Sequence, residues 1–170
     1  MRYVVDPSRS RVWIDARSSL HPIHSQTDGL EGWLEADPDG HAVTAGEVAL
    51  PVDRLSSGNP LYDREMRRRV DVRRYPSISG RLTSMQPTGH DGRYHVAGEV
   101  TFRGVSHEYE DEMQLQVHDD GAIELDGEGV FDIRDFGMEP PRILTLRVYP
   151  DVSVRVSIVA ARDGNDGKEG

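Results

Sequence analysis

The stretch Tyr94-His-Val-Ala-Gly-Glu-Val-Thr-Phe-Arg-Gly104 decides the fold of this chain. Apolar residues or glycine occupy every second position from Tyr94 to Phe102, and most of the residues between them are polar. A period of two predicts a β-strand that packs one face inward and leaves the other in water. The stretch from Gly127 to Gly137 begins with the same alternation, and inward glycines are typical of a sheet that bends. Together the two stretches predict a sheet rolled into a barrel.

The same alternation recurs along most of the chain. It predicts eight strands, near residues 12–16, 30–36, 48–52, 78–82, 94–102, 109–117, 123–133 and 152–158. Short connections join several of them, and Asp119-Asp-Gly121 is typical of a hairpin turn. The prediction is therefore an all-β fold with one short helix, built as an eight-stranded antiparallel up-and-down barrel of the lipocalin type.

The short helix is predicted between the third and fourth strands, over residues 60–70. Asn59 is its expected N-cap and Pro60 lies in its first turn, where proline is tolerated. Leu61, Met66 and Val70 are expected to share one side, so the helix is predicted to cover one end of the barrel.

The chain is predicted to fold as one domain over residues 1–162, followed by a flexible tail. Residues 163–170 contain no apolar side chain, which is typical of a loose terminus. No apolar run approaches the roughly 20 residues of a membrane-spanning helix, so no membrane span is predicted. The N-terminus shows no apolar core of a signal peptide, which predicts a cytoplasmic protein.

Composition excludes several kinds of function. The 170 residues carry a net charge of −10, from 20 basic and 30 acidic side chains. This balance disfavours a nucleic-acid-binding protein, because phosphate contacts require a basic surface. The chain contains no cysteine, which excludes disulfides and thiolate metal sites.

An ordered set of short motifs resembles a known family. They are Tyr3-Val-Val-Asp-Pro7, Ser10-Arg-Val-Trp-Ile14, Arg74-Tyr-Pro-Ser-Ile78, Tyr94-His-Val-Ala-Gly98, Phe102-Arg-Gly-Val105, Ile133-Arg-Asp-Phe-Gly137 and the apolar strand 152–158. In this order they resemble the YceI-like family of polyisoprenoid-binding proteins, which are lipocalin-like barrels. The resemblance implies binding, and sequestration or carriage, of an apolar isoprenoid-like or lipid-like molecule. It also implies that relatives are often secreted or periplasmic, and that dimers are common.

The inward face of the barrel is the candidate ligand site. Small residues on this face (Ala16, Gly32, Gly80, Gly98, Gly127 and Gly129) favour an interior with room for a ligand, although they would equally serve a sheet that only bends. The side chains expected to contact the ligand are Ile14, Leu34, Leu50, Met66, Ile78, Leu82, Val100, Met113, Phe131 and Phe136.

Arginines near the helix are candidates for the ligand's polar end. The run from Arg64 to Arg74 contains six arginines, and arginine suits bidentate contact with phosphate or carboxylate. Arg67 and Arg74 are the two predicted to meet an anionic head group. The alternative is a solvated helix face whose arginines pair with Asp63, Glu65 and Asp71.

Three other functions are kept as alternatives: haem or metal binding, a small enzyme, and a barrel with a closed, dry core that works only through contacts with a partner. His21, His24 and His107 suggest haem or metal binding, although no cofactor or metal is predicted. A small enzyme such as a lyase, cyclase or hydrolase would need Asp111, Tyr94, His107 or Tyr109 to converge in the interior. No catalytic motif is present, so no catalytic residue is predicted. Trp13 and Trp33 fall out of phase with the inward residues, which leaves a homodimer interface open.

Overall fold

The computed structural model describes residues 1–39, 42–143 and 145–164, and it contains mostly β-strands. One α-helix, α1 (Pro60–Val70), and two short 3₁₀ turns, η1 (Val52–Arg54) and η2 (Ile133–Phe136), accompany them. The strands are β1 (Arg2–Val5), β2 (Arg11–Ser18), β3 (Ile23–Thr27), β4 (Glu31–Ala36), β5 (Val43–Pro51), β6 (Ser77–Pro87), β7 (Arg93–Phe102), β8 (Val105–Val117), β9 (Ile123–Asp132), β10 (Arg142–Ile143) and β11 (Leu146–Arg162).

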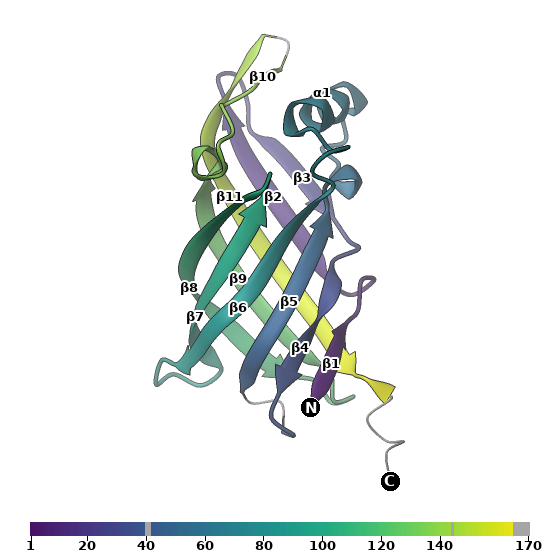
Figure 1. The fold of residues 1–170 in the computed structure, drawn as a ribbon, viewed down its shortest axis with the longest axis vertical. Helices are drawn as coiled ribbons and strands as arrows, with labels where there is room; N and C mark the ends of the chain where they lie inside the picture. Colours follow the sequence, from purple (N-terminus) through teal and green to yellow (C-terminus); the bar gives the residue numbers. More distant parts are fainter. Residues whose placement is uncertain (40–41, 144, 165–170) are drawn as a thin grey trace.

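The strands form a closed antiparallel barrel. The order β1-β4-β5-β6-β7-β8-β9-β11 returns to its start, because β1 pairs with both β4 and β11. Eight strands therefore make up the ring, which confirms the predicted fold. Figure 1 shows the strands running obliquely up the long axis, with the N-terminus and the end of β11 at the lower end and α1 at the upper end.

Three short strands were not predicted, β1, β3 and β10, and the first two extend the wall. In the upper half of the barrel β11 pairs with β2 instead of β1, and β2 pairs in turn with β3. Consequently β1 and β2 follow one another along the same edge of β11, like a single strand interrupted at Asp6–Ser10. The short β10 pairs with the beginning of β11 and forms the hairpin at the top of Figure 1.

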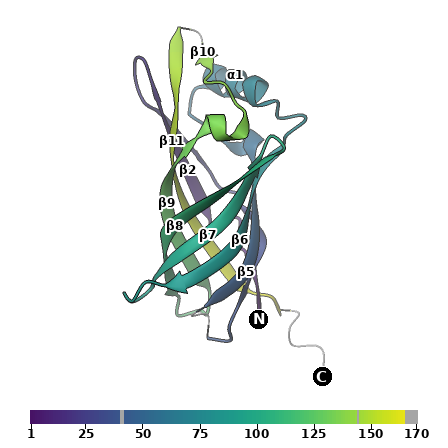
Figure 2. The ribbon, with the colours of Figure 1, turned by 60° about the vertical axis from the view of Figure 1, so that its left-hand side comes forward.

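The helix lies where the sequence predicted it and covers the upper end of the barrel, as Figure 2 shows from a second side. The Asn59 side chain accepts hydrogen bonds from the backbone N–H groups of Leu61 (3.1 Å) and Tyr62 (3.3 Å), which satisfies two of the free donors of the first turn. Val70 is buried and Met66 is half-buried against the end of the barrel. Leu61, in contrast, points away and is 47% exposed.

The lower half of the barrel is filled with side chains. Its cluster of buried residues includes Tyr3, Leu34, Ile123 and Ala160, each at most 4% exposed. Side chains from opposite walls meet here, because β1, β4, β9 and β11 all remain paired down to this end. Dense packing of this kind accounts for most of the stability of a small β-barrel.

In the upper half the wall is less continuous. The recorded pairing of β8 with β9 covers only Met113–Val117 with Ile123–Gly127, so the first part of β8 and the last part of β9 run unpaired with each other. On the opposite side, among the described residues, β3 pairs with the segment after η1 through the isolated bridge Gln26↔Ser56. The upper half thus depends on α1, η2 and their loops to complete its enclosure.

At its C-terminal end, β11 continues to Arg162, whose neighbour Asp163 donates its backbone N–H to the Arg2 carbonyl (3.0 Å). Most of the predicted tail, residues 165–170, lies outside the described residues. The boundary between domain and tail at residue 162 therefore stays a prediction.

Candidate ligand site

The upper half of the barrel encloses an apolar cavity of about 340 Å³ beneath α1. Its volume falls at the lower end of the range typical of small-molecule sites, roughly 300–1,000 Å³. The walls come from residues of β2, β3, β5, β6, β7, β9 and β11, and the roof comes from α1, η2 and the segment after η2. Most of the lining is aliphatic or aromatic, so the site is suited to an apolar guest.

Seven of the ten side chains predicted to contact a ligand line this cavity. They are Ile14, Leu50, Met66, Ile78, Val100, Phe131 and Phe136. Phe136 lies in η2, where it is buried and meets the Phe102 ring edge-on at a centroid distance of 6.0 Å. The barrel strands, the helix and the 3₁₀ turn therefore contribute to one space.

The other three predicted contacts, Leu34, Leu82 and Met113, do not line the cavity. Leu34 is 4% exposed within the packed lower half, and Leu82 and Met113 pack against the same cluster. Their inward direction was read correctly from the alternation, but the alternation does not reveal how high along the barrel a residue lies. The inward face therefore divides into a filled half and a hollow half.

The small residues of the inward face also divide between those that line the cavity and those whose space is taken by neighbouring atoms. Only Ala16 and Gly80 line the cavity. The space beside Gly127 is occupied by Met113, whose Cγ would lie 2.8 Å from an added Cβ. At Gly32 an added Cβ would meet the Glu47 carbonyl oxygen at 2.0 Å, because the strands approach closely there. Most of these glycines thus serve sheet curvature and packing, and few of them provide room for a ligand.

Several lining residues were not among the predicted contacts. They are mainly the inward residues of β11 (Val148, Val152, Val154 and Val156) and residues outside regular strands (Leu30, Leu55, Tyr62, Met138 and Pro141). The β11 residues share the alternation of the other strands, so the same signal was available to find them. The others lie in loops or the helix, where no period of two marks the inward side.

Polar groups gather at the α1 end of the cavity. Asp63 and Arg67 are the charged side chains of its lining, and Ser57 and Tyr62 lie beside them. The Asp63 carboxylate accepts hydrogen bonds from the Ser57 backbone N–H (2.9 Å) and hydroxyl (2.7 Å). These two hydrogen bonds satisfy the Asp63 carboxylate, so the polar groups remain at the α1 end of the cavity.

The two arginines predicted to meet a head group lie in different surroundings. Arg67 lines the cavity, and its guanidinium donates to the Asp53 carbonyl oxygen at 3.2 Å. Arg74 does not line it, since its guanidinium lies over the Tyr75 ring at 5.4 Å from the centroid. Arg74 follows the helix, beyond its Asp71 C-cap, and lies outside the cavity lining.

The three histidines considered for haem or metal binding have separate partners. His21 stacks on Tyr62 with ring centroids 6.1 Å apart, and His24 pairs with Asp15 at 2.5 Å. His107 lies 3.9 Å from an oxygen of Asp135. Among the described residues no group of three or more His, Cys, Asp or Glu side chains could hold a metal ion. The histidine hypothesis therefore gains no support.

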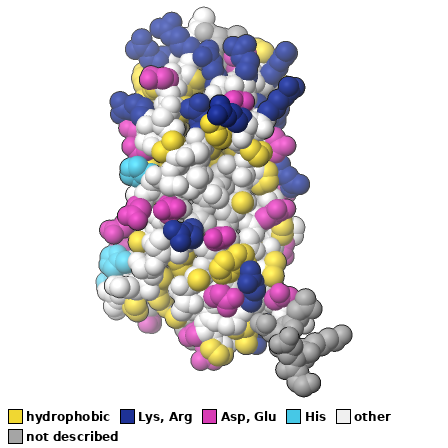
Figure 3. All heavy atoms as spheres, viewed as in Figure 1, with side chains coloured by type: hydrophobic (Ala, Val, Ile, Leu, Met, Phe, Trp, Pro, Cys, Tyr) yellow, Lys and Arg dark blue, Asp and Glu magenta, His cyan; other side chains and the backbone are white. Residues whose placement is uncertain are grey.

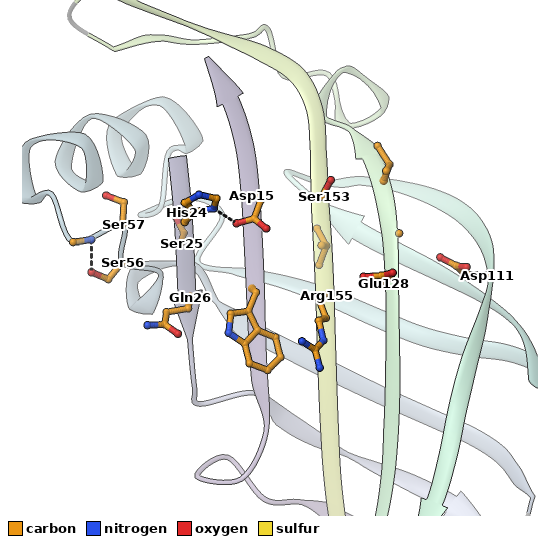
Figure 4. Close-up of a pocket in the computed structure, with 15 residues that line it drawn as sticks. Asp15, His24, Ser25, Gln26, Ser56, Ser57, Asp111, Glu128, Ser153 and Arg155 are labelled. Atoms are coloured by element: carbon orange, nitrogen blue, oxygen red, sulfur yellow. Dashed lines mark hydrogen bonds and ion pairs between the residues drawn. The ribbon is translucent and has the colours of Figure 1, made fainter. Parts of the chain in front are cut away.

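A second depression lies on the outer wall and is polar. Figure 4 shows Asp15 and His24 joined by a hydrogen bond, with Glu128 and Arg155 on neighbouring strands. Its volume, 1060 Å³, exceeds that of the interior cavity, but it is open to solvent and lined largely by charged and hydroxyl groups. An apolar molecule would gain little there, because such groups lose hydration when they are covered.

Asp111 and Tyr109 lie where β8 separates from β9. Asp111 is inward by register, facing Val96 of β7, yet it is exposed because β9 is no longer paired beside it. Tyr109 packs against Phe131 and donates its hydroxyl to Asp135 at 3.1 Å. Burial, with this hydrogen bond, raises the pKa of Tyr109 well above its usual value near 10. Tyr109 thus forms a structural contact between β8 and η2, and neither Tyr109 nor Asp111 lines the cavity.

The two tryptophans considered for a dimer interface are each covered by an arginine. The Arg155 guanidinium lies 4.8 Å from the Trp13 ring centroid, and that of Arg2 lies 4.4 Å from the Trp33 centroid. Both rings are half-buried on the outer wall. A homodimer through these residues stays a prediction.

Comparison with solved structures places the fold among known barrels. A Burkholderia cenocepacia protein, BcnA, superposes with a TM-score of 0.80 at 17% identity, covering 92% of this chain and 99% of that one. A polyisoprenoid-binding domain from Saccharophagus degradans, implicated in plant cell wall breakdown, gives a TM-score of 0.79 at 14% identity over 95% of this chain and 98% of that one. The Campylobacter jejuni YceI protein gives 0.68 at 13% identity, with coverage of 83% and 86%.

Sequence comparison gives the family. No curated protein sequence matches the chain. No helix among the described residues has the length and apolar character needed to cross a membrane. The profile of the YceI-like domain matches residues 3–160, which is nearly the full length of the barrel. The chain therefore belongs to the YceI-like domain family.

Proposed function

We propose that this protein binds one apolar molecule, isoprenoid-like or otherwise lipid-like, inside the upper half of the barrel and sequesters or carries it. The observation that supports the proposal is the 340 Å³ cavity, whose lining is mostly aliphatic and aromatic. Removing the ligand's apolar surface from water would supply the binding energy, at roughly 25 cal/mol per Å². The polyisoprenoid-binding domain of Saccharophagus degradans, which shares the fold, supports this class of ligand.

The cavity also limits what the ligand can be. If a methylene group takes about the 30 Å³ that a water molecule occupies in the liquid, the enclosed space holds about ten such groups. A longer chain would have to extend beyond the enclosed space. Affinity should therefore rise steeply from shorter to intermediate prenyl alcohols and then level off.

We further propose that the ligand's polar end lies under α1, near Arg67. Arg67 is the cationic side chain of the lining, and the polar groups Ser57, Tyr62 and Asp63 surround the same end. An anionic head group would find a charge-assisted hydrogen bond there. Arg74 provides a matched control, because its replacement removes the same charge from outside the lining.

The first experiment is native mass spectrometry of the purified protein, followed by lipid extraction and a thermal-unfolding series with geraniol, farnesol and geranylgeraniol. We expect bound lipid, or a rise in Tm with the prenyl alcohols, because a ligand of the native state stabilises it. Absence of both would refute the binding proposal.

The second experiment compares farnesol with farnesyl diphosphate in the Arg67→Gln and Arg74→Gln variants. The Arg67 substitution is expected to weaken the diphosphate about tenfold and leave farnesol unchanged, as expected for one charge-assisted hydrogen bond. Equal effects of the two substitutions would contradict the assignment of the polar end.

A further inference from the structure

The upper end of the molecule carries a concentration of positive charge. Figure 3 shows arginine side chains, in dark blue, gathered at the end where Figure 1 places α1 and β10. Six arginines in and just after α1 form this patch, here called the arginine face: Arg64, Arg67, Arg68, Arg69, Arg73 and Arg74. The patch is unexpected in a chain whose net charge is −10.

Most charges of the arginine face are not neutralised by carboxylates. Among the described residues only Arg68 reaches one, Glu65, at 4.0 Å. Arg69 donates to the Arg142 carbonyl oxygen (3.3 Å), and neither Arg64 nor Arg73 has a carboxylate within ion-pair distance in the described part of the chain. Of the arginines in this patch, Arg68 is thus the one with an ion pair to an acid of the helix among the described residues.

Arginines on the barrel wall are arranged differently. Arg9 pairs with Asp120 at 3.3 Å, Arg81 with Glu99 at 3.7 Å and Arg93 with Glu112 at 3.1 Å. These three arginines are thus paired with carboxylates, whereas most arginines of the arginine face are not. Such an asymmetry orients the molecule in an external field, with the arginine face toward a negative surface.

Exposed apolar side chains accompany the positive charge. Leu20, at the tip of the β2–β3 hairpin, is 71% exposed, and Leu61, in the first turn of α1, is 47% exposed. The hairpin and the helix lie side by side, since the rings of His21 and Tyr62 stack. Unpaired arginines beside protruding leucines are the two components of a surface that binds at a bilayer interface.

We propose that the arginine face docks on the anionic surface of a phospholipid bilayer, with Leu20 and Leu61 at the level of the head groups. Phospholipid phosphates would provide the missing partners of the arginines, and the acidic wall would point away from the membrane. A nucleic acid would meet the same charges but would gain nothing from the leucines, and the acidic wall would repel it. The proposal is independent of the cavity ligand, because plain phospholipid vesicles test it.

The test is cosedimentation of the full chain with phosphatidylcholine vesicles and with vesicles containing equal phosphatidylcholine and phosphatidylglycerol. Binding is expected only with phosphatidylglycerol, and it is expected to fall as salt shortens the Debye length. A triple variant, Arg64→Gln, Arg69→Gln and Arg73→Gln, changes three unpaired arginines that lie outside the cavity lining. At about fivefold for each arginine near an anionic surface, it is expected to bind roughly a hundredfold more weakly.

The matched control replaces three wall arginines, Arg9→Gln, Arg81→Gln and Arg93→Gln, for the same change in net charge. This variant is expected to retain most of its vesicle binding. Equal losses in the two variants, equal binding to neutral vesicles, or binding of duplex DNA in the absence of vesicle binding would each overturn the proposal.

Tryptophan fluorescence reports which end approaches the lipid and does not depend on the arginines. Leu20→Trp places a probe at the proposed contact, and Val117→Trp places one at the opposite end, where Val117 is 43% exposed. A blue shift on addition of anionic vesicles is expected for the first probe and not for the second, after subtraction of the emission of the unsubstituted protein. A shift at the Val117 position alone would show that the other end binds.

Discussion

Filling the cavity from Gly80 offers a direct test of where a ligand lies. Gly80 faces inward on β6 between Val48 of β5 and Val100 of β7. An added Cβ would meet only the Val48 Cγ2 atom within contact range, at 3.4 Å. Gly80→Val therefore introduces three carbon atoms into the hollow half with little displacement of its neighbours.

The expected loss of affinity follows from the space removed. Three carbon-sized groups of ligand would no longer fit, and each buried methylene contributes roughly 0.8 kcal/mol, so the variant should lose about 2.4 kcal/mol of binding free energy. That loss corresponds to about a fiftyfold rise in Kd. Stability of the empty protein should not fall, because valine favours β-strands and glycine within a strand weakens them.

Isothermal titration with farnesol, together with thermal unfolding of the empty variant, measures both quantities. Ala97→Val is the matched control, since Ala97 lies out of phase with the inward residues of β7 and adds its carbon atoms to the outer wall. A Gly80→Val protein that remains folded and binds farnesol as tightly as the control would refute the placement of the ligand in this cavity.

Three further predictions concern stability. Asn59→Ala should destabilise the protein by about 1 kcal/mol, because it removes the helix cap, whereas Asn59→Gly should cost only a few tenths, as measured by urea unfolding. Leu34→Ala should lower the free energy of unfolding by about 2–5 kcal/mol, because the substitution leaves a void in the packed lower half. The Ile78 side chain already borders the cavity, so a smaller loss for Leu34→Ala than for Ile78→Ala would contradict the division of the barrel. Tyr109 has a raised folded-state pKa, so its contribution to stability is present below pH about 10 and is lost as the pH rises beyond it. Tyr109→Phe should therefore lower the free energy of unfolding by about 0.5–1.5 kcal/mol at neutral pH. Its Tm should also fall less steeply than that of the unsubstituted protein between neutral and alkaline pH. An equally steep fall of Tm in both proteins would contradict the assigned hydrogen bond to Asp135.

The fold was largely predictable because the alternation of apolar and polar residues is a local signal. It identified all eight long stretches of the barrel and the helix with its Asn59 cap. It missed β3, whose residues Ile23-His-Ser-Gln-Thr27 place a single large apolar side chain inward, and β1, which is only four residues long. In both strands the pairing partner decides the conformation more than the strand's own sequence does.

The candidate site was only partly predictable because it depends on distances between distant segments. The sequence indicates that Leu34, Met113 and Val100 face inward, but it does not indicate that the first two meet other side chains while Val100 faces a cavity. Nor does it show that β8 and β9 part above Gly127. Where opposing walls touch depends on strand tilt and on the length of each pairing, which are properties of the closed barrel.

The division of the barrel into a filled and a hollow half has an evolutionary consequence. Residues that secure folding, such as Tyr3 and Ile123, are spatially separate from those that would select a guest. Substitutions in the lining of the upper half can therefore alter which molecules fit without disturbing the packed lower half that stabilises the fold. A barrel of this kind can change its ligand specificity while its fold stays constant, even at low sequence identity.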